Sequence, residues 1–298
     1  LDRKKGGLFM VPGNAYGTTK GGMRFLLRDI ISNKTLFQRS DKPYVVMMGT
    51  NIIFNMDLNT IIDAHENSGA QMTVVYCKAT HNVDDETKLE INENGRLTGV
   101  SAGVVYGDNA SMDCCIVNRE TLLEIIDHYQ AADYLDLLEA LQGDFGNIDV
   151  CSYEYKGEVV GVFSEKSLYR RSMDLLDQTV ADQLFDPERP ILTKAHDVPP
   201  SRYATGSHAC NSIISAGCII KGTVRNSILS RGVVVEEGAS VTNSIINQSC
   251  IIKSGARVEN AILDKNNVVP TNTELRGTPE NILVLGKAPL TSDTTIVR

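Results

Sequence analysis

Hydrophobic and polar residues follow two different patterns along this chain. Before residue 183, short continuous apolar runs alternate with segments whose apolar residues recur every three or four positions. Continuous runs predict buried strands, and the longer spacing predicts helices. Alternating strands and helices indicate an α/β domain with a mostly parallel sheet. The predicted strands are 44–48, 72–76, 114–117 and an edge strand at 149–155, and the predicted helices are 22–32, 58–69, 122–129, 135–141 and 167–176.

The last third of the chain repeats one tripeptide. Asn-Ser-Ile stands at 211–213, 226–228 and 243–245, and Asn-Ala-Ile follows at 260–262, with aliphatic runs and glycines in between. A three-sided coil of about 18 residues puts one aliphatic side chain per face into a narrow interior and a tight turn at each corner. The recurrence therefore predicts a left-handed parallel β-helix of hexapeptide repeats from about 211 to about 269. It argues against the alternative, an antiparallel β-sandwich.

Prolines cluster between these two parts of the chain. Four of them fall between residues 187 and 200, where an extended linker fits better than a helix or a strand. We therefore expect three segments: a partial α/β domain at 1–182, a linker at 183–205 and a β-helix domain at 206–298.

Charge and cysteine content exclude several kinds of partner. The net charge of −8 argues against nucleic acid, whose phosphates need a basic surface. No apolar run approaches the ~20 residues of a membrane span, and no signal peptide is visible. The seven cysteines form no CxxC pair and no zinc-type spacing, as expected for reduced thiols in a cytoplasmic protein without a structural metal. Because the chain opens with Leu1, we expect a trimmed or fragmentary chain.

The first place to look for chemistry is the end of the 44–48 strand. Ligands of parallel α/β sheets bind at the carboxyl ends of strands, and Gly49, Thr50 and Asn51 occupy this end. The Asn51 amide can form hydrogen bonds but is a poor ligand for Mg²⁺, which prefers carboxylates and phosphates. A turn-forming role for Asn51 is equally compatible with its position.

An α/β domain followed by a left-handed β-helix resembles the sugar-nucleotide pyrophosphorylases, and most of all bacterial ADP-glucose pyrophosphorylase, the glucose-1-phosphate adenylyltransferase family. The resemblance runs from about Tyr44 onward and rests on several separate motifs. The segments that carry it are Met56-Asp57 with the helix after it (GDHxYxMDY in the family), Ser111-Met112 (the sugar-pocket strand), 157–176 (GYWxDxGTxxxYxxxNMDLL), Thr193-Lys194 with Pro199-Pro200 (the linker) and 226–233 (the first coils).

The departures from these motifs concern the residues that carry the chemistry. Aligned on Met56-Asp57, the family's metal-binding Asp of GDH falls on Asn51, and aligned on Met173-Asp174, its second metal Asp falls on Gly161. The family's FxEKP lysine, which contacts the sugar phosphate, has no counterpart between 88 and 103. The glycine-rich loop that grips the nucleotide phosphates is absent from this chain. Nucleotidyl transfer needs metal ions and cations to neutralise phosphate charge, so these losses argue against chemistry in this chain.

The family contains degenerate copies of this kind, the GlgD-type subunits, which modulate an active GlgC-type partner in glycogen synthesis. The resemblance implies a catalytically degenerate GlgD-type regulatory subunit without a cofactor or metal of its own, with Mg²⁺ expected in the partner. It implies a heterotetramer with the partner, and it allows a homodimer or higher self-association. It also implies a sugar phosphate effector, for which Lys194 and Arg202 near the domain junction are candidates, solvated linker charges being the alternative. The vestigial substrate pocket would comprise Gly49, Thr50, Asn51, Ser111, Met112 and Asp113.

Two enzymatic alternatives remain at the level of sequence. An active nucleotidyltransferase would need another carboxylate, for which Asp57 and Asp113 are the nearest candidates, although Asp57 also suits a helix N-cap. A hexapeptide acyltransferase would need a histidine base near the coils, and His208 at their entry is the candidate. A binding-only relative of the translation-initiation-factor exchange complex would need an extra C-terminal helical domain, which nothing here resembles.

Overall fold

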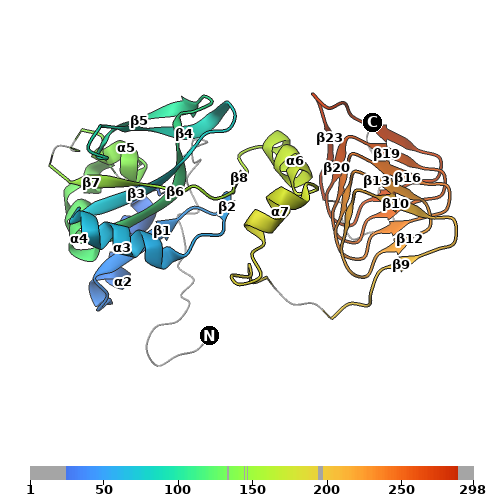
Figure 1. Cartoon of the computed structure of the whole chain (residues 1–298), viewed down its shortest axis with the longest axis horizontal. Coiled ribbons are helices and arrows are strands. Elements are labelled where there is room, and N and C mark those ends of the chain that lie inside the picture. The colour runs from blue at the N-terminus through green and yellow to red at the C-terminus, as the bar shows by residue number, and fades with distance from the viewer. Residues whose placement is uncertain (1–24, 133, 144, 146, 194–196, 288–298) are drawn as a thin grey trace. The chain divides into compact units, whose positions relative to one another are not determined.

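A computed structural model describes residues 25–287 except 133, 144, 146 and 194–196. The chain forms two compact units, Leu1–Val159 and Val160–Arg298, each described below by itself (Figure 1). The α/β domain is predicted to end at 182, and the residues from Val160 to 182 belong to the same compact unit as the β-helix.

A six-stranded sheet forms the centre of the first unit. Its strand order is β5-β4-β6-β3-β7. The strand β1 also pairs with β6, along Cys114 to Asn118, whereas β4 pairs with β6 at Ala110. The strands are β1 (Tyr44–Met48), β3 (Met72–Lys78), β4 (Val83–Ile91), β5 (Leu97–Val104), β6 (Asn109–Asn118) and β7 (Val150–Glu154), and the short strand β2 (Ile52–Phe54) follows β1.

The sheet is mixed, so the prediction of a mostly parallel sheet is wrong. Among the described strands of this sheet only β3 and β7 pair in parallel, whereas β1, β3 and β4 all run antiparallel to β6 and β4 runs antiparallel to β5. The prediction failed because a continuous apolar run indicates burial on both faces and not strand direction. It also missed the β4–β5 hairpin, whose charged residues hide its strand pattern. Nevertheless β1, β3 and β7 share one direction, so their carboxyl ends lie at one edge of the sheet.

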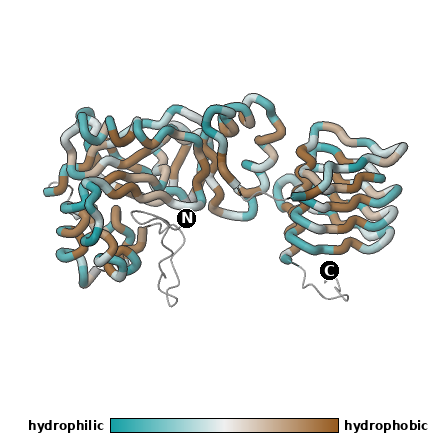
Figure 2. The backbone as a smooth tube through the Cα atoms, turned by 90° about the horizontal axis from the view of Figure 1, so that it is seen from below, coloured by the Kyte–Doolittle hydropathy of each residue, from teal (hydrophilic) through white to brown (hydrophobic). Residues whose placement is uncertain are grey.

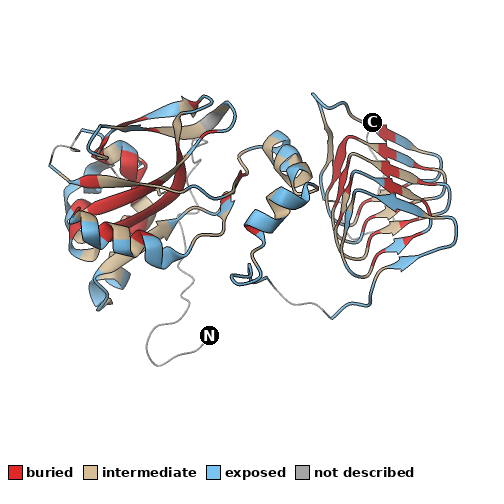
Figure 3. Ribbon diagram, in the orientation of Figure 1, coloured by how far each residue is buried: buried red, intermediate tan, exposed pale blue. Residues whose placement is uncertain are grey.

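Helices cover both faces of this sheet. The helix α3 packs through Ile61 against Val75 and Ile116 on one face, and α4 packs through Leu122 with Cys115 on the other. The inner strands are accordingly buried (Figure 3). The helices are α1 (Leu27–Ser32), α2 (Lys34–Arg39), α3 (Leu58–Ser68), α4 (Arg119–His128), the 3₁₀ helix η1 (Gln130–Ala132) and α5 (Leu137–Leu141). The predicted helix at 22–32 begins at Leu27 within the described residues.

The second unit contains the predicted parallel β-helix. Three five-stranded sheets, in the orders β10-β13-β16-β19-β22, β11-β14-β17-β20-β23 and β21-β18-β15-β12-β9, form its three sides. Side chains at equivalent places of successive coils fill the interior. Figure 2 shows hydrophobic segments recurring from coil to coil along the backbone. The strands are β8 (Val159–Gly161), which crosses the unit boundary, and then β9 (Arg202–Tyr203), β10 (His208–Cys210), β11 (Ile213–Ile214), β12 (Ile219–Ile220), β13 (Thr223–Arg225), β14 (Ile228–Leu229), β15 (Val234–Val235), β16 (Ser240–Thr242), β17 (Ile245–Ile246), β18 (Ile251–Ile252), β19 (Arg257–Glu259), β20 (Ala261–Leu263), β21 (Val268–Val269), β22 (Glu274–Arg276) and β23 (Leu283–Leu285).

The repeated tripeptide forms one corner of each coil. Its asparagines adopt positive φ angles, for example 46° at Asn226 and 46° at Asn243, a conformation that asparagine tolerates better than most residues. The serines of the second and third repeats, Ser227 and Ser244, are fully buried. The hydroxyl of Ser244 donates to the carbonyl of Thr242 and accepts from the amide of Ala261 in the next coil. Hydrogen bonds between side chain and backbone therefore connect the coils at this corner.

The isoleucine of the tripeptide points outward, not into the interior. Leu229, Ile246 and Leu263 belong to the interior cluster, so the preceding residue in each strand faces the other way. Ile245 and Ile262 are nonetheless only 6% and 4% exposed. The helix α6 (Glu165–Asp174) lies beside this face, followed by α7 (Gln178–Leu184) (Figure 1).

A hydrogen bond joins α6 to the coils. The hydroxyl of Tyr169 donates to the carbonyl of Asn243 over 2.7 Å, and burial raises the pKa of this phenol. Ser164 and Ser167 form a capping box at the start of the helix, which satisfies backbone donors there. The second unit therefore consists of the β-helix and a helical cover on one of its sides.

Candidate functional site

The predicted pocket residues meet at the carboxyl end of β1. In the antiparallel pair β1–β6, Met48 lies opposite Cys114, which brings Gly49 beside Asp113. The amide of Gly49 donates to the carbonyl of Asp113 over 2.7 Å. Two segments that are far apart in the sequence, 49–51 and 111–113, therefore form one site at the sheet edge.

Asp113 has an unusual backbone conformation for its place in the fold. Its φ is +45°, although it lies inside β6 and is only 7% exposed. Its amide donates to the hydroxyl of Ser111. Val75 of β3 pairs with Cys114 and the next residue, Tyr76, pairs with Ser111, so the register shifts across Asp113. A β-bulge of this kind re-aims a side chain, here the carboxylate of Asp113.

Gly49 has no room for a side chain because two neighbours converge on it. A Cβ atom at Gly49 would lie 2.9 Å from the Cβ of Asp113, 3.5 Å from its Oδ2 and 3.1 Å from the Oδ1 of Asn51. The Nδ2 atom of Asn51 is buried and has no hydrogen-bond partner in the described part of the chain. An amide and a carboxylate thus face the same glycine.

The remaining predicted pocket residues have different surroundings. Met112 is 1% exposed and packs with the α3 side of the core, so its role is structural, and Thr50 is exposed. Burial, and secondly the charge of Asp113, raises the pKa of the Cys114 thiol to about 12. Burial likewise raises the pKa of Cys115 far above its usual value. These thiols stay protonated at neutral pH and are not nucleophiles.

The donor set around Gly49 does not suit the metal ion that the fold implies. Mg²⁺ takes carboxylates, phosphates and water in octahedral geometry. In the described ranges no group of three or more His, Cys, Asp or Glu side chains lies together. Asp113 is the one carboxylate beside Asn51 in the contacts of Gly49, and Asp57 is the N-cap of α3, where it accepts from the amide of Asn59 over 2.9 Å. Gly161, at the end of β8, offers no donor side chain.

The two effector candidates are not seen together. Arg202 is an exposed residue of β9, opposite Ile219 in the parallel pair β9–β12. Lys194 lies outside the described residues. The sequence prediction of an effector site at these positions stays a prediction.

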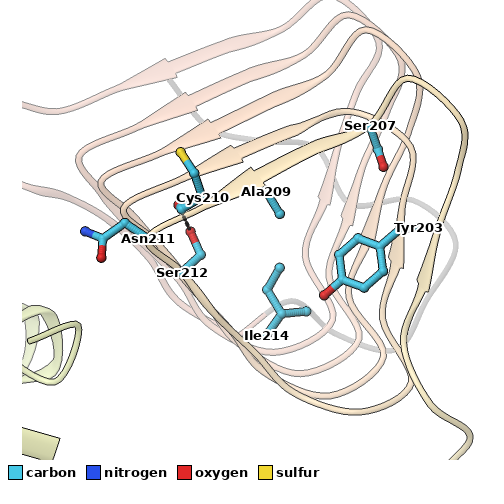
Figure 4. Close-up of a pocket in the computed structure, with 7 residues that line it drawn as sticks. All are labelled: Tyr203, Ser207, Ala209, Cys210, Asn211, Ser212 and Ile214. Carbon is cyan, nitrogen blue, oxygen red and sulfur yellow. Dashed lines mark hydrogen bonds between the residues drawn. The ribbon is translucent and has the colours of Figure 1, made fainter. Parts of the chain in front are cut away.

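The first coil of the β-helix surrounds a hollow of about 380 Å³ (Figure 4). Tyr203 and Ile214 point toward this hollow, which also has polar walls. His208 is exposed on β10 and is not among the residues that line the hollow, so this geometry gives the acyltransferase reading no support. A second hollow of about 330 Å³ lies beside α4, with His128 and Ile148 in its wall.

The fold defines a two-unit protein in which an α/β unit, with Asn51 and Asp113 against Gly49 at the end of β1, precedes a hexapeptide-repeat β-helix. The family model "GlmU-like, C-terminal hexapeptide" matches residues 198–281. The glycogen biosynthesis protein GlgD of Bacillus subtilis is 30% identical over 294 residues, which are 96% of this chain and 75% of that protein. GlgD of Geobacillus stearothermophilus is 30% identical over 244 residues, 81% of this chain and 62% of that protein.

Enzymes of the same family match at a similar level. The glucose-1-phosphate adenylyltransferase of Halalkalibacterium halodurans is 30% identical over 303 residues, covering 96% of this chain and 77% of the enzyme. The chain belongs to the family of GlgD proteins and glucose-1-phosphate adenylyltransferases. No described helix has the length and hydrophobicity to cross a membrane.

Proposed function

We propose that this protein is a GlgD-type regulatory subunit in glycogen biosynthesis, without catalytic activity of its own, that modulates a GlgC-type glucose-1-phosphate adenylyltransferase. The observation that carries the proposal is the donor set at the end of β1, where the amide of Asn51 and the carboxylate of Asp113 lie against Gly49. Nucleotidyl transfer requires concentrated positive charge on the phosphates, supplied by metal ions and basic side chains. In the part of the chain that the structure describes, this edge presents the amide of Asn51 and the carboxylate of Asp113. The similarity to GlgD proteins supports the same reading.

The proposal includes a heterotetramer with the catalytic partner, with Mg²⁺ bound by the partner and no cofactor in this subunit. Its support is the β-helix, whose edge strands β9, β10 and β11 stand at one end of the three sheets and expose backbone groups suited to contacts. Reduced cysteines support a cytoplasmic location, since all seven are free.

Activity measurements with and without the partner test this function. ADP-glucose formation from ATP, glucose 1-phosphate and Mg²⁺ is followed for the chain alone, the partner alone and the two together. We expect background turnover from the chain alone, and a rate or effector response in the mixture that the partner alone does not reach. Turnover of the chain alone near that of the partner would contradict the proposal.

Two controls locate the activity. A mixture with a catalytically inactive partner should be inactive, because the chemistry belongs to the partner. The double substitution Asn51→Asp and Gly161→Asp should restore little activity to this chain, because the sugar-phosphate lysine is missing as well. Strong recovery would show that the two carboxylates alone are limiting.

Regulation by a sugar phosphate forms part of the same proposal, with Arg202 as its binding residue. The guanidinium of Arg202 is exposed and suited to a phosphate. In the mixed enzyme, Arg202→Ala should weaken activation by a sugar phosphate, whereas Arg225→Ala, an exposed arginine on β13, should leave it unchanged. An equal response of both variants would remove Arg202 from the proposal.

A further inference from the structure

One outer side of the β-helix has the features of a docking surface for a second copy of this chain. We propose that the sheet β9-β12-β15-β18-β21 binds residues 178–192 of another copy, and that the first copy's residues 178–192 bind that copy in return. The inference does not depend on the proposed function, because it concerns contact between identical chains.

The three sides of the β-helix differ in their outward side chains. On the β10-β13-β16-β19-β22 side these are polar, as at Thr242 and Glu259, which suits contact with water. On the β11-β14-β17-β20-β23 side they are apolar, and Ile245 and Ile262 are buried on the side where α6 lies (Figure 1). The third side is apolar as well but is not buried. Its outward residues are Ile219, which is 37% exposed, and the partly exposed Val234, Ile251 and Val268.

These four outward residues form a continuous apolar stripe. Ile219 pairs with Val234 and Val234 with Ile251 in parallel register, and the pairing of Ile251 with Val268 extends the stripe. With strands about 4.8 Å apart, the stripe is about 14 Å long. Scattered apolar residues are ordinary at a protein surface, whereas contiguous ones mark contact sites. The chain covers its other apolar side with a helix, so a cover of similar chemistry is expected here.

Positive charge surrounds the stripe. The basic residues at its corners and in its first coil are Arg202, Lys221, Arg231, Lys253 and Lys265. The acidic residues there are Glu236, Glu237 and Asp264, of which Glu236 pairs with Lys253. Bases therefore outnumber acids around the stripe, although the net charge of the chain is −8. This side is suited to an apolar segment that carries negative charge.

Residues 178–192, which comprise α7 and the segment after it, have this chemistry. Phe185, Ile191 and Leu192 are exposed, and Leu192 is 89% exposed, so the segment does not bury these side chains in its own chain. Its charged residues are Asp182, Asp186, Glu188 and Arg189, three acids and one base, which gives a net charge of −2. An apolar segment with negative charge thus occurs in the same chain as an apolar stripe with positive charge.

Two further properties favour a symmetric pair. Pro187 and Pro190 restrict the backbone of the segment, so less conformational entropy is lost when it binds. In a two-fold pair each copy gives one segment and receives one, which forms the junction twice and closes the assembly. A small junction therefore contributes twice to the affinity of the pair.

Sedimentation equilibrium of the full chain without any other protein tests the inference. We expect a concentration-dependent dimer that weakens between about 0.1 M and about 0.5 M salt, because part of the attraction is between charges. Leu192→Ser should weaken the dimer at least about tenfold, since the lost contact occurs twice. The matched control is Val105→Ser in the exposed turn between β5 and β6, which should change the dimer constant by less than about twofold.

A second pair of variants tests the receiving side. Val234→Thr combined with Ile251→Thr makes the stripe polar and keeps branched side chains that suit strands, so the coils should still fold. This double variant should also weaken the dimer at least about tenfold. Ile213→Thr, at an exposed outward position on another side, is its control and should leave the dimer unchanged.

A wild-type chain that stays monomeric would overturn the inference, as would a dimer that Leu192→Ser and the double variant leave intact. A dimer that salt strengthens would contradict the charge complementarity that identifies the occupant. If the chain alone is monomeric and the same variants instead weaken binding of a GlgC-type partner, the stripe belongs to that partner and not to a second copy. Regulation of the partner in mixed assays is a separate readout, so the proposed function can stand or fall independently.

Discussion

At the scale of single residues, positive φ angles separate two kinds of position in this molecule. The corner asparagines of the β-helix, such as Asn226 and Asn243, use a conformation that suits their short polar side chains. Asp113 uses the same region inside a strand, at a sheet edge, with a buried carboxylate. The corner residues form the turns of the coils, whereas the positive φ of Asp113 belongs to a bulge in the pairing of β3 with β6.

His65 is a second residue whose surroundings allow a sharp prediction. It is 1% exposed, with Nδ1 2.8 Å from the Thr73 hydroxyl, Nε2 3.1 Å from the Asn118 side-chain oxygen and the ring edge-on to Tyr44. His65→Phe keeps an aromatic ring but removes both hydrogen bonds, one from the buried hydroxyl of Thr73 and one from the partly buried side chain of Asn118. We expect a loss of about 2 to 4 kcal/mol in the free energy of unfolding, measured by urea denaturation.

The control for this substitution is His81→Phe. His81 is exposed in a loop after β3, so the change should stay within about 0.5 kcal/mol. A loss at His65 no larger than at His81 would mean that the two hydrogen bonds contribute nothing to stability.

At the scale of elements, the serine column connects the coils of the β-helix. Ser244 accepts from the Ala261 amide through its hydroxyl, and its own amide donates to the hydroxyl of Ser227 in the preceding coil. Ser244→Ala removes a buried acceptor from Ala261 and should cost about 1 to 3 kcal/mol in urea denaturation. Ser212→Ala is the matched control. The Ser212 hydroxyl likewise donates to a carbonyl two residues earlier and accepts from the next coil, but it lies at the open first coil, where water can replace it. The loss of stability should therefore be smaller. Equal losses of unfolding free energy in the two variants would show that burial of the serine hydroxyl does not determine its contribution to stability.

Glu236 connects two coils on another side and makes stability depend on pH. It accepts from the Ser254 amide and pairs with Lys253, and these contacts lower the pKa of its carboxyl group, the amide bond contributing most. Because the pKa of Glu236 is lower in the folded than in the unfolded protein, its carboxylate stabilises the fold fully above the unfolded-state pKa of about 4.3. This stabilisation is lost as the pH falls through the folded-state pKa. Glu236→Gln should therefore lower the thermal midpoint at about pH 7. The difference in midpoint between variant and wild type should shrink as the pH falls from about 5 to about 3.

A difference in midpoint that stays constant over this pH range would rule out the carboxylate as its source. Glu237→Gln provides the control, because this neighbouring residue is exposed and its substitution removes the same charge.

At the scale of the whole molecule, the division into two compact units predicts two thermal transitions. Multidomain chains depart from two-state unfolding when each unit has its own core, as here with separate clusters in the α/β unit and in the β-helix. In scanning calorimetry of the full chain, His65→Phe should lower only the transition of the first unit and Ser244→Ala only that of the second. A single transition that both variants lower equally would show that the units unfold as one.

The sequence by itself determined the β-helix and most of the strands and helices of the α/β unit, and its resemblance to the family predicts that Asn51 and Gly161 stand where the family has its metal carboxylates. These features depend on local recurrence and on residue identity, which the chain carries directly. The tertiary structure alone decided the direction of the strands, the outward placement of Ile245 and the meeting of Asp113 with Gly49. Apolar content reports burial but not strand direction, and a contact between residues far apart in the chain exists only after β6 has paired with β1.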